Sequence, residues 1–201
     1  VGAGGTLENP TEVKGYSENP DIKSDENGKT TWHWTAKNML DFAWSADRDY
    51  TVKSFTVLDG PKVNLVYQPS EATKYWEELQ PYVTKYFQLM NATFGKYVYP
   101  SYSIVQGGDG GMEYAMCTLM LGNGTPDGIL GTAAHEMGHS WFQHILASNE
   151  SKHPWMDEGF TSYIEDLALN DLKEKKDENP FKGNYASYYK LVESGKEQPQ
   201  T

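Results

Sequence analysis

The sequence predicts an α+β fold, and three observations support this prediction. Two strand-like segments flank a turn within residues 50–67, and two more lie on either side of a glycine run at residues 107–111. Apolar residues recur at three- and four-residue spacing within residues 70–95, which is typical of an amphipathic helix. Residues 129–147 have the composition of a long, mostly buried helix.

Composition and charge exclude several classes of protein. The chain has 201 residues, enough for one domain or for one domain and part of another. The formal charge of −11 argues against a nucleic-acid partner, because phosphate binding needs a basic surface. No apolar run approaches the roughly 18 residues of a membrane span. The single cysteine, Cys117, excludes an internal disulfide framework and a zinc site built from several cysteines.

The beginning of the chain differs in composition from the rest. Residues 1–30 are rich in turn clusters, which predicts loops with short strands. A run of aromatic residues follows in residues 31–44. We interpret residues 1–46 as the C-terminal part of a β-rich domain and residues 47–201 as the next domain, with the boundary near Asp47.

The first elements of the second domain are a hairpin and a helix. Asp59-Gly60-Pro61-Lys62 is turn chemistry between two strands and predicts the hairpin. The helix that follows is expected to begin after Ser70 as N-cap and to end at Gly95. Pro81 lies inside it, which predicts a kink near residues 77–80.

Two strands and three helices should follow. We expect the strands over residues 97–106 and 112–121. The helices are expected over residues 129–147, about 157–175 and about 185–192. The tyrosines of the last helix are most simply interpreted as core residues: Tyr185, Tyr188 and Tyr189.

His135-Glu136-Met137-Gly138-His139 has the H-E-x-x-H pattern of a metal site. Residues four apart on a helix lie one turn apart on the same face, so both imidazoles can reach one ion. Glu136 lies on the adjoining part of that face, where it can accept a proton from a water held by the metal. The alternative is a pair of core histidines bonded to backbone carbonyls.

Glu158 strengthens the metal interpretation. It stands after a gap of 18 residues from His139, at the expected start of the next helix, which can return beside the first. His135, His139 and Glu158 could then bind one Zn²⁺, with a fourth position open to water and Glu136 as catalytic base. A structural site would instead be closed by four protein ligands. Glu165 either orients a histidine ligand from behind or is an exposed helix carboxylate.

Other chemistry-bearing residues have ordinary interpretations. The glycine run precedes a strand and lacks a following Lys-Ser or Lys-Thr, so it is not a phosphate-binding loop. Cys117 has no histidine close in sequence and is expected to be a small buried apolar residue. His33, His144 and His153 are expected to be surface or capped residues, and His144 would lie about 140° from His139 on a regular helix.

Three segments together resemble the M1 family of zinc aminopeptidases, the gluzincins with a thermolysin-like catalytic domain. They are a Gly-Met-Glu-Tyr-Ala-Met segment beginning at Gly111, which varies the family's Gly-x-Met-Glu-Asn motif, the pattern from His135 to His139, and Glu158-Gly159 at the family's spacing. The first and last segments look most like bacterial members. The resemblance covers residues 31–192 and implies a mixed sheet packed on the helices that carry the zinc site.

The resemblance also implies a reaction, the hydrolysis of the N-terminal peptide bond with one zinc ion per chain. Glu113 would receive the free α-amino group of a peptide substrate. The backbone around Gly110, Gly111 and Met112 would align that peptide as an added strand. Neither the cellular compartment nor the preferred N-terminal residue follows from the sequence.

Departures from the family pattern limit this expectation. In the family, a tyrosine several dozen residues beyond the glutamate ligand donates to the developing oxyanion, and here only 43 residues follow Glu158. We expect this tyrosine, the C-terminal helical domain and most of the β domain outside this chain, which would then be weak or inactive alone. The alternatives are a thermolysin-like endopeptidase and an inactive module that binds zinc or peptides.

Overall fold

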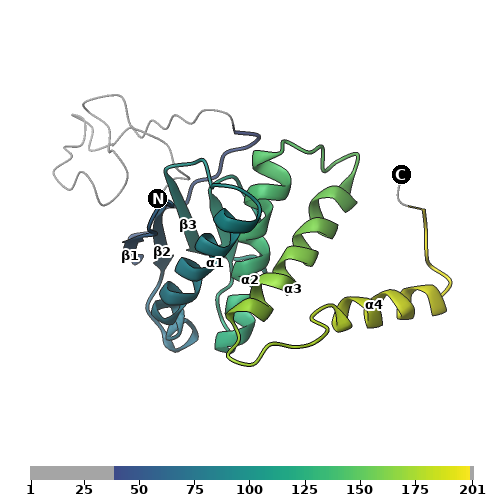
Figure 1. Cartoon of the computed structure of the whole chain (residues 1–201). Helices are drawn as coiled ribbons and strands as arrows, with labels where there is room; N and C mark the ends of the chain where they lie inside the picture. The colour runs from purple at the N-terminus through teal and green to yellow at the C-terminus, as the bar shows by residue number, and fades with distance from the viewer. Residues whose placement is uncertain (1–38, 200–201) are drawn as a thin grey trace.

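The computed structural model describes residues 39–199. A four-stranded sheet and the helices α1, α2 and α3 form the body of the molecule, and α4 extends away from it (Figure 1). None of the helices in this part of the chain has the length and apolar character needed to cross a membrane. The β-rich domain expected at residues 1–46 lies almost wholly outside the described residues, as does His33.

The sheet is mixed and has the strand order β1-β2-β3-β4. β1 (Thr51–Thr56) and β2 (Lys62–Tyr67) form the predicted antiparallel hairpin. β3 (Ser101–Gln106) and β4 (Cys117–Met120) are added in parallel. Asp59 adopts a φ of 57° in the hairpin turn, a backbone region that Asp tolerates better than most residues. The predicted α+β class is confirmed.

β4 begins later than predicted. The strand was expected over residues 112–121, but residues 112–116 form a loop. Met116 has a φ of 58°, which interrupts the extended backbone directly before Cys117. Met112 forms an isolated antiparallel bridge with Leu119, so the loop folds back along the outer side of β4. The segment that precedes the strand therefore lies at the edge of the sheet.

The helical segment between β2 and β3 is broken near the predicted place. Two short 3-10 helices, Glu71–Thr73 and Trp76–Glu78, come before α1 (Leu79–Thr93). Pro81 lies in the first turn of α1, where its missing N–H removes no intrahelical hydrogen bond. Gly95 follows the helix with a φ of 109°, as expected of a glycine that ends a helix.

The two helices that follow the sheet lie where predicted but are less regular. α2 (Pro126–His139) continues into a π-helical segment, Ser140–Ile145. α3 (Phe160–Leu172) is preceded by another π-helical segment, Trp155–Gly159. In a π-helix the backbone bonds join residues five apart, so the side chains occupy different faces from those of an α-helix.

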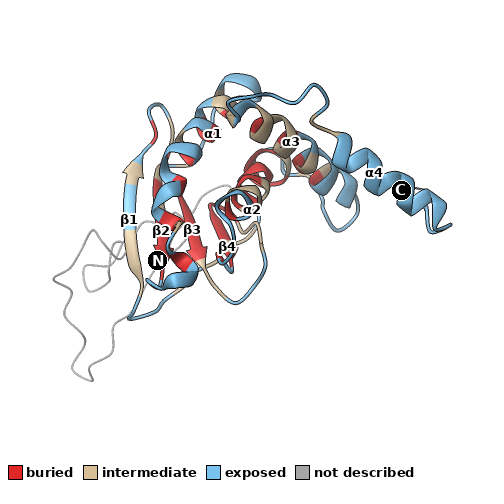
Figure 2. Ribbon diagram, turned by 90° about the horizontal axis from the view of Figure 1, so that it is seen from below, coloured by how far each residue is buried: buried red, intermediate tan, exposed pale blue. Residues whose placement is uncertain are grey.

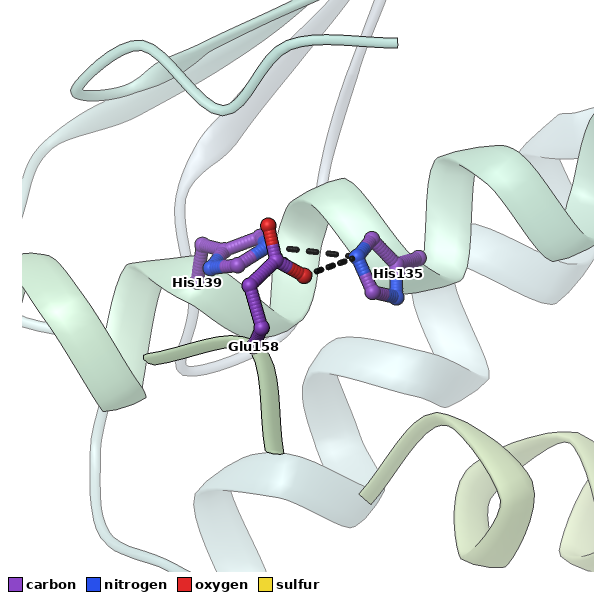
Figure 3. A group of neighbouring side chains, drawn as sticks. All are labelled: His135, His139 and Glu158. Carbon is purple, nitrogen blue, oxygen red and sulfur yellow. Dashed lines mark hydrogen bonds and ion pairs between the residues drawn. The ribbon is translucent and has the colours of Figure 1, made fainter. Parts of the chain in front are cut away.

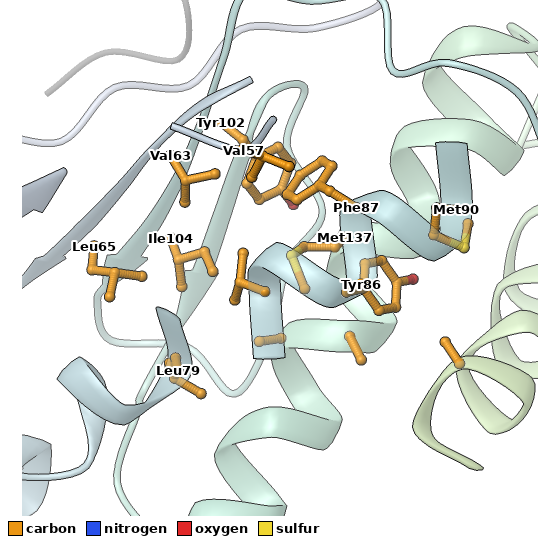
Figure 4. Packing of buried hydrophobic residues seen from close by; sticks show 14 of the residues in the cluster. Val57, Val63, Leu65, Leu79, Tyr86, Phe87, Met90, Tyr102, Ile104 and Met137 are labelled. Atoms are coloured by element: carbon orange, nitrogen blue, oxygen red, sulfur yellow. The ribbon is translucent and has the colours of Figure 1, made fainter. Parts of the chain in front are cut away.

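Alternate residues of the strands divide between two apolar clusters, as the pleat of a sheet requires. Val63 and Leu65 belong to the large cluster, which joins the sheet to α1, α2 and α3 (Figure 4). Val66 and Val105 belong to a smaller cluster that includes Cys117. The burial of Cys117 confirms its prediction as a small apolar residue. The large cluster fixes α2 against the sheet, and Figure 2 shows the buried residues concentrated there.

α4 (Lys182–Glu193) contains no buried residue and projects from the body (Figure 2). The interpretation of its tyrosines as core residues is therefore wrong for the described part of the chain. Helical periodicity predicts an apolar face but not the element that covers it. The start of α4 is held by Phe181, whose ring stacks on that of Tyr163 at 4.8 Å between centroids.

Candidate metal centre

The three predicted ligands converge on one point (Figure 3). Nε2 of His135 lies 3.3 Å from Nε2 of His139 and 3.2 Å from Oε2 of Glu158. Nε2 of His139 lies 3.8 Å from the same oxygen. With bonds of about 2.0–2.1 Å, the ligand atoms of a tetrahedral zinc ion stand about 3.3 Å apart. These three donor atoms therefore fit a zinc ion.

Carboxylates behind the imidazoles hold the two rings in orientation. Nδ1 of His135 lies 2.9 Å from Oε2 of Glu165. Nδ1 of His139 bonds to Oδ1 of Asp157, and both of these side chains are buried. Because an ionised carboxylate only accepts, Nδ1 is the donor in both rings and Nε2 faces the shared position. This tautomer is the one that a metal bound through Nε2 requires.

Carboxylates lie against both imidazoles of the site. The hydrogen bond to Glu165 raises the pKa of His135 to about 9, although burial acts in the opposite direction. Nε2 of the same ring faces the carboxylate of Glu158. Because a coordinating imidazole must be neutral, metal binding at His135 competes with its protonation.

Glu136 is buried beside the ligands, and its Oε2 has no hydrogen-bond partner within the described part of the chain. Burial raises the pKa of its carboxyl group to about 7, against the lowering effect of His135 and His139. A carboxyl group with a pKa near neutrality and a free oxygen can both accept and donate a proton. This chemistry is the one expected of the predicted base.

Glu113 lies next to the same centre. One of its carboxylate oxygens is within 4.8 Å of ligand atoms of both Glu136 and His139. Its carboxylate is also within 4.8 Å of oxygens of Glu150 and Asp157. The structure thus brings Glu113, from the loop before β4, next to α2 and to the π-helical segment that carries Asp157. The group formed by Glu113, Glu150 and Asp157 was not predicted from the sequence.

The residues before Glu113 differ in their surroundings. A Cβ placed on Gly111 would stand 2.3 Å from Oε1 of Glu136, whereas the corresponding space at Gly110 is open. Met112 exchanges backbone hydrogen bonds of 2.9 and 3.0 Å with Leu119. Gly111 is therefore next to Glu136, and the residue that follows it is bonded to β4.

Two residues at the site had no predicted role there. Asp157 carried no prediction, and only its position beside Glu158 could have drawn attention to it. His144, expected to be a surface or capped residue, is buried, and its Nε2 donates to the carbonyl oxygen of Glu113 at 2.7 Å. It lies in the π-helical segment, so the angle of about 140° from His139, which holds for a regular helix, does not apply to it. His153 is exposed, as expected.

Curated proteins that are similar to this chain carry the name leucine aminopeptidase 2. The Aspergillus fumigatus protein is 26% identical over 163 residues, which are 76% of this chain and 25% of that protein. The Saccharomyces cerevisiae protein is 27% identical over 115 residues, which are 53% of this chain and 17% of that protein. The chain thus spans a quarter or less of the length of these relatives. No family model matches it.

Solved structures with a similar fold are zinc metallopeptidases. A variant M1 zinc metallopeptidase from Deinococcus radiodurans, bound to a Tyr-Ser-Ala substrate, aligns with a TM-score of 0.55 at 18% identity. The alignment covers 71% of this chain and 33% of that chain. Another structure, an M1 zinc metallopeptidase from the same organism, gives a TM-score of 0.54 at 17% identity, over 73% of this chain and 32% of that one. The body described above shares its fold with part of these enzymes.

Proposed function

We propose that this chain is part of a zinc aminopeptidase of the M1 family, with a thermolysin-like catalytic domain. The observation that carries the proposal is the geometry of the donor set. Two Nε2 atoms and one carboxylate oxygen lie 3.2–3.8 Å apart, with each Nδ1 bonded to a carboxylate. The similarity to proteins named leucine aminopeptidase 2 and to M1 metallopeptidase structures supports the same reaction class.

His135, His139 and Glu158 would hold the zinc ion, which when bound supplies a Lewis acid for water and for the scissile carbonyl. Glu136 would take a proton from the attacking water and pass it to the leaving amine. The burial that raises its pKa suits both steps, because the same group must accept and then donate. A retained base of this kind argues against the inactive binding module.

Glu113 would receive the free α-amino group of the peptide. Its carboxylate lies within 4.8 Å of Glu136, so an amine bound there is close to the reacting bond. The nearby carboxylates of Glu150 and Asp157 make this region negative, which favours an ammonium group. The backbone of Gly111, at the edge of the sheet, could pair with an extended peptide. These contacts favour an aminopeptidase over an endopeptidase, which has no use for Glu113.

Metal content tests the zinc site. Plasma mass spectrometry of the purified chain should find about one zinc per chain, and the zinc should be lost in His135→Ala and in Glu158→Ala. Glu178→Ala, an exposed carboxylate on the loop before α4, should keep it. A folded wild-type chain that takes up no added zinc would contradict the proposal.

Peptide binding tests whether the site recognises a free amino terminus, as an aminopeptidase does and an endopeptidase does not. The zinc-loaded chain should bind a short peptide with a free amino terminus more tightly than its N-acetylated form, by isothermal titration calorimetry. Glu113→Gln should remove this difference. Equal affinity for the two forms in the wild type would favour the endopeptidase instead. Binding without any turnover in the full-length protein would favour the inactive module.

A further inference from the structure

The π-helical segment after α2 changes which residues face the site. Amides of Leu146 and Ser148 donate to the carbonyls of Trp141 and Gln143, five residues earlier, at 3.2 Å. In a π-helix, two residues five positions apart therefore lie closer to the same face of the helix. In a regular α-helix, the same two residues would be about 140° apart around the axis. His144 is five positions beyond His139. The π-helical segment thus directs His144 towards the side of the helix that carries the metal ligands.

Among residues 39–199, the side chain of His144 makes one hydrogen bond, to the loop that carries Glu113. The ring is 4% exposed, and Nε2 donates to the carbonyl oxygen of Glu113 at 2.7 Å. A carbonyl oxygen only accepts, so Nε2 is the donor of this bond. Nδ1 has no hydrogen-bond partner within residues 39–199. The side chain therefore connects this loop to the helix that continues from the ligand His139.

The Glu113 side chain lies among other carboxylates, which tend to push it away. The carboxylate of Glu113 lies within 4.8 Å of those of Glu150 and Asp157, and like charges at this distance repel one another. Gln143, the residue before His144, holds Glu150 with a hydrogen bond of 2.6 Å. Met112, before Glu113, exchanges backbone hydrogen bonds with Leu119, and the amide of Ala115, after it, donates to Oδ1 of Asp41. The bond from His144 opposes the movement of Glu113 away from the centre.

We infer that His144 is a positioning residue that fixes the backbone of Glu113, and hence its carboxylate, at the place where a substrate amino group is bound. This inference rests on the proposed role of Glu113 as the amine-binding residue. In this assignment the side-chain hydrogen bond of His144 goes to neither a proposed metal ligand nor the substrate. It acts through the loop, with His139 and His144 as two fixed points on one continuous helical segment.

The test compares the preference of the zinc-loaded chain for a free over an N-acetylated peptide in three variants. His144→Leu removes the donor and should lower this preference at least tenfold, with unchanged zinc content and unchanged affinity for the acetylated peptide. His144→Gln should retain most of the preference, since its amide nitrogen can reach the same carbonyl. His144→Asn, whose shorter amide cannot reach, should behave like His144→Leu and serves if the leucine variant does not fold.

Trp141→Phe is the matched control. It removes a 2.7 Å bond from the indole Nε1 to the carbonyl of Gly95, in the same π-helical segment but away from Glu113. We expect a lower melting temperature and an unchanged peptide preference. If His144→Leu keeps the wild-type preference, or Trp141→Phe lowers it equally, the inference is wrong. A wild-type chain with no preference for the free amino group overturns the proposed function as well.

Discussion

The carboxylate of Glu136 lies against the backbone of Gly111, so closely that a Cβ at Gly111 would stand 2.3 Å from Oε1. Glu136 belongs to α2, and Gly111 belongs to the loop at the edge of the sheet. The proposed base and the proposed peptide-binding segment are therefore in contact. The absence of a side chain at Gly111 leaves the room that the Glu136 carboxylate occupies.

Gly111→Ala should reduce catalysis without unfolding the protein. The added methyl group must displace the end of Glu136, and a shift of about 1 Å in a catalytic group can cost about 10²-fold in rate. We expect a loss of this size in kcat/KM of the full-length, zinc-loaded protein for a peptide with a free amino terminus. Gly108→Ala, where the space is open, should change kcat/KM little. Equal losses in the two variants would show that Gly111 has no special role.

Asp157→Asn should weaken zinc binding. Asp157 is buried and accepts from Nδ1 of His139, so its charge supports the metal-binding tautomer of that ring. Loss of such a partner typically lowers metal affinity about 10–100-fold. Competition with a chromophoric chelator measures this change. Glu165→Gln should act in the same direction through His135, whereas the exposed Glu178→Gln should have no effect. Unchanged zinc affinity in Asp157→Asn would exclude the role.

Gly138→Ala should destabilise the fold where α2 meets α3. A Cβ at Gly138 would stand 3.0 Å from the Cγ2 methyl of Thr161 and 3.2 Å from the hydroxyl of Tyr86. Overpacking of this kind costs about 1–3 kcal/mol in the free energy of unfolding. Gly131→Ala on the same helix meets its nearest atom only at 4.0 Å and should be neutral or stabilising by up to about 1 kcal/mol. Urea unfolding curves that rank the two variants in the opposite order would contradict this packing.

Cys117 should resist alkylation in the folded protein. Burial raises the pKa of its thiol to about 12, so the reactive thiolate is scarce at pH 8. Its side chain is also packed within the smaller apolar cluster. We expect iodoacetamide to modify Cys117 slowly in native protein and rapidly in urea, as followed by intact mass. Rapid modification without denaturant would mean that β4 opens readily.

Much of the candidate metal centre could be predicted from the sequence because its donor residues are close together along the chain. His135 and His139 are one helical turn apart, so any helix there places them on one face. The gap to Glu158 allows the next helix to return beside the first. The hairpin around Asp59 and the break before α1 also follow from local turn and proline chemistry.

Contacts between segments that are distant in the sequence could be found only in the tertiary structure. The hydrogen bond of Asp157 to His139 and the contact of Gly111 with Glu136 join segments whose distance in space does not depend on residue spacing. The position of His144 depends on a π-helical segment, which shifts the faces on which all periodic predictions rest.

The sequence by itself determined the donor types, their order along the chain and the α+β class, since these follow from side-chain chemistry and short-range periodicity. Only the folded structure decided which carboxylate supports His139, where the loop of Glu113 is held, and that the tyrosines of α4 are exposed. The physical reason is the same in each case. Burial and hydrogen-bond partners depend on packing between distant segments, and a pattern in the sequence specifies a face but not its partner.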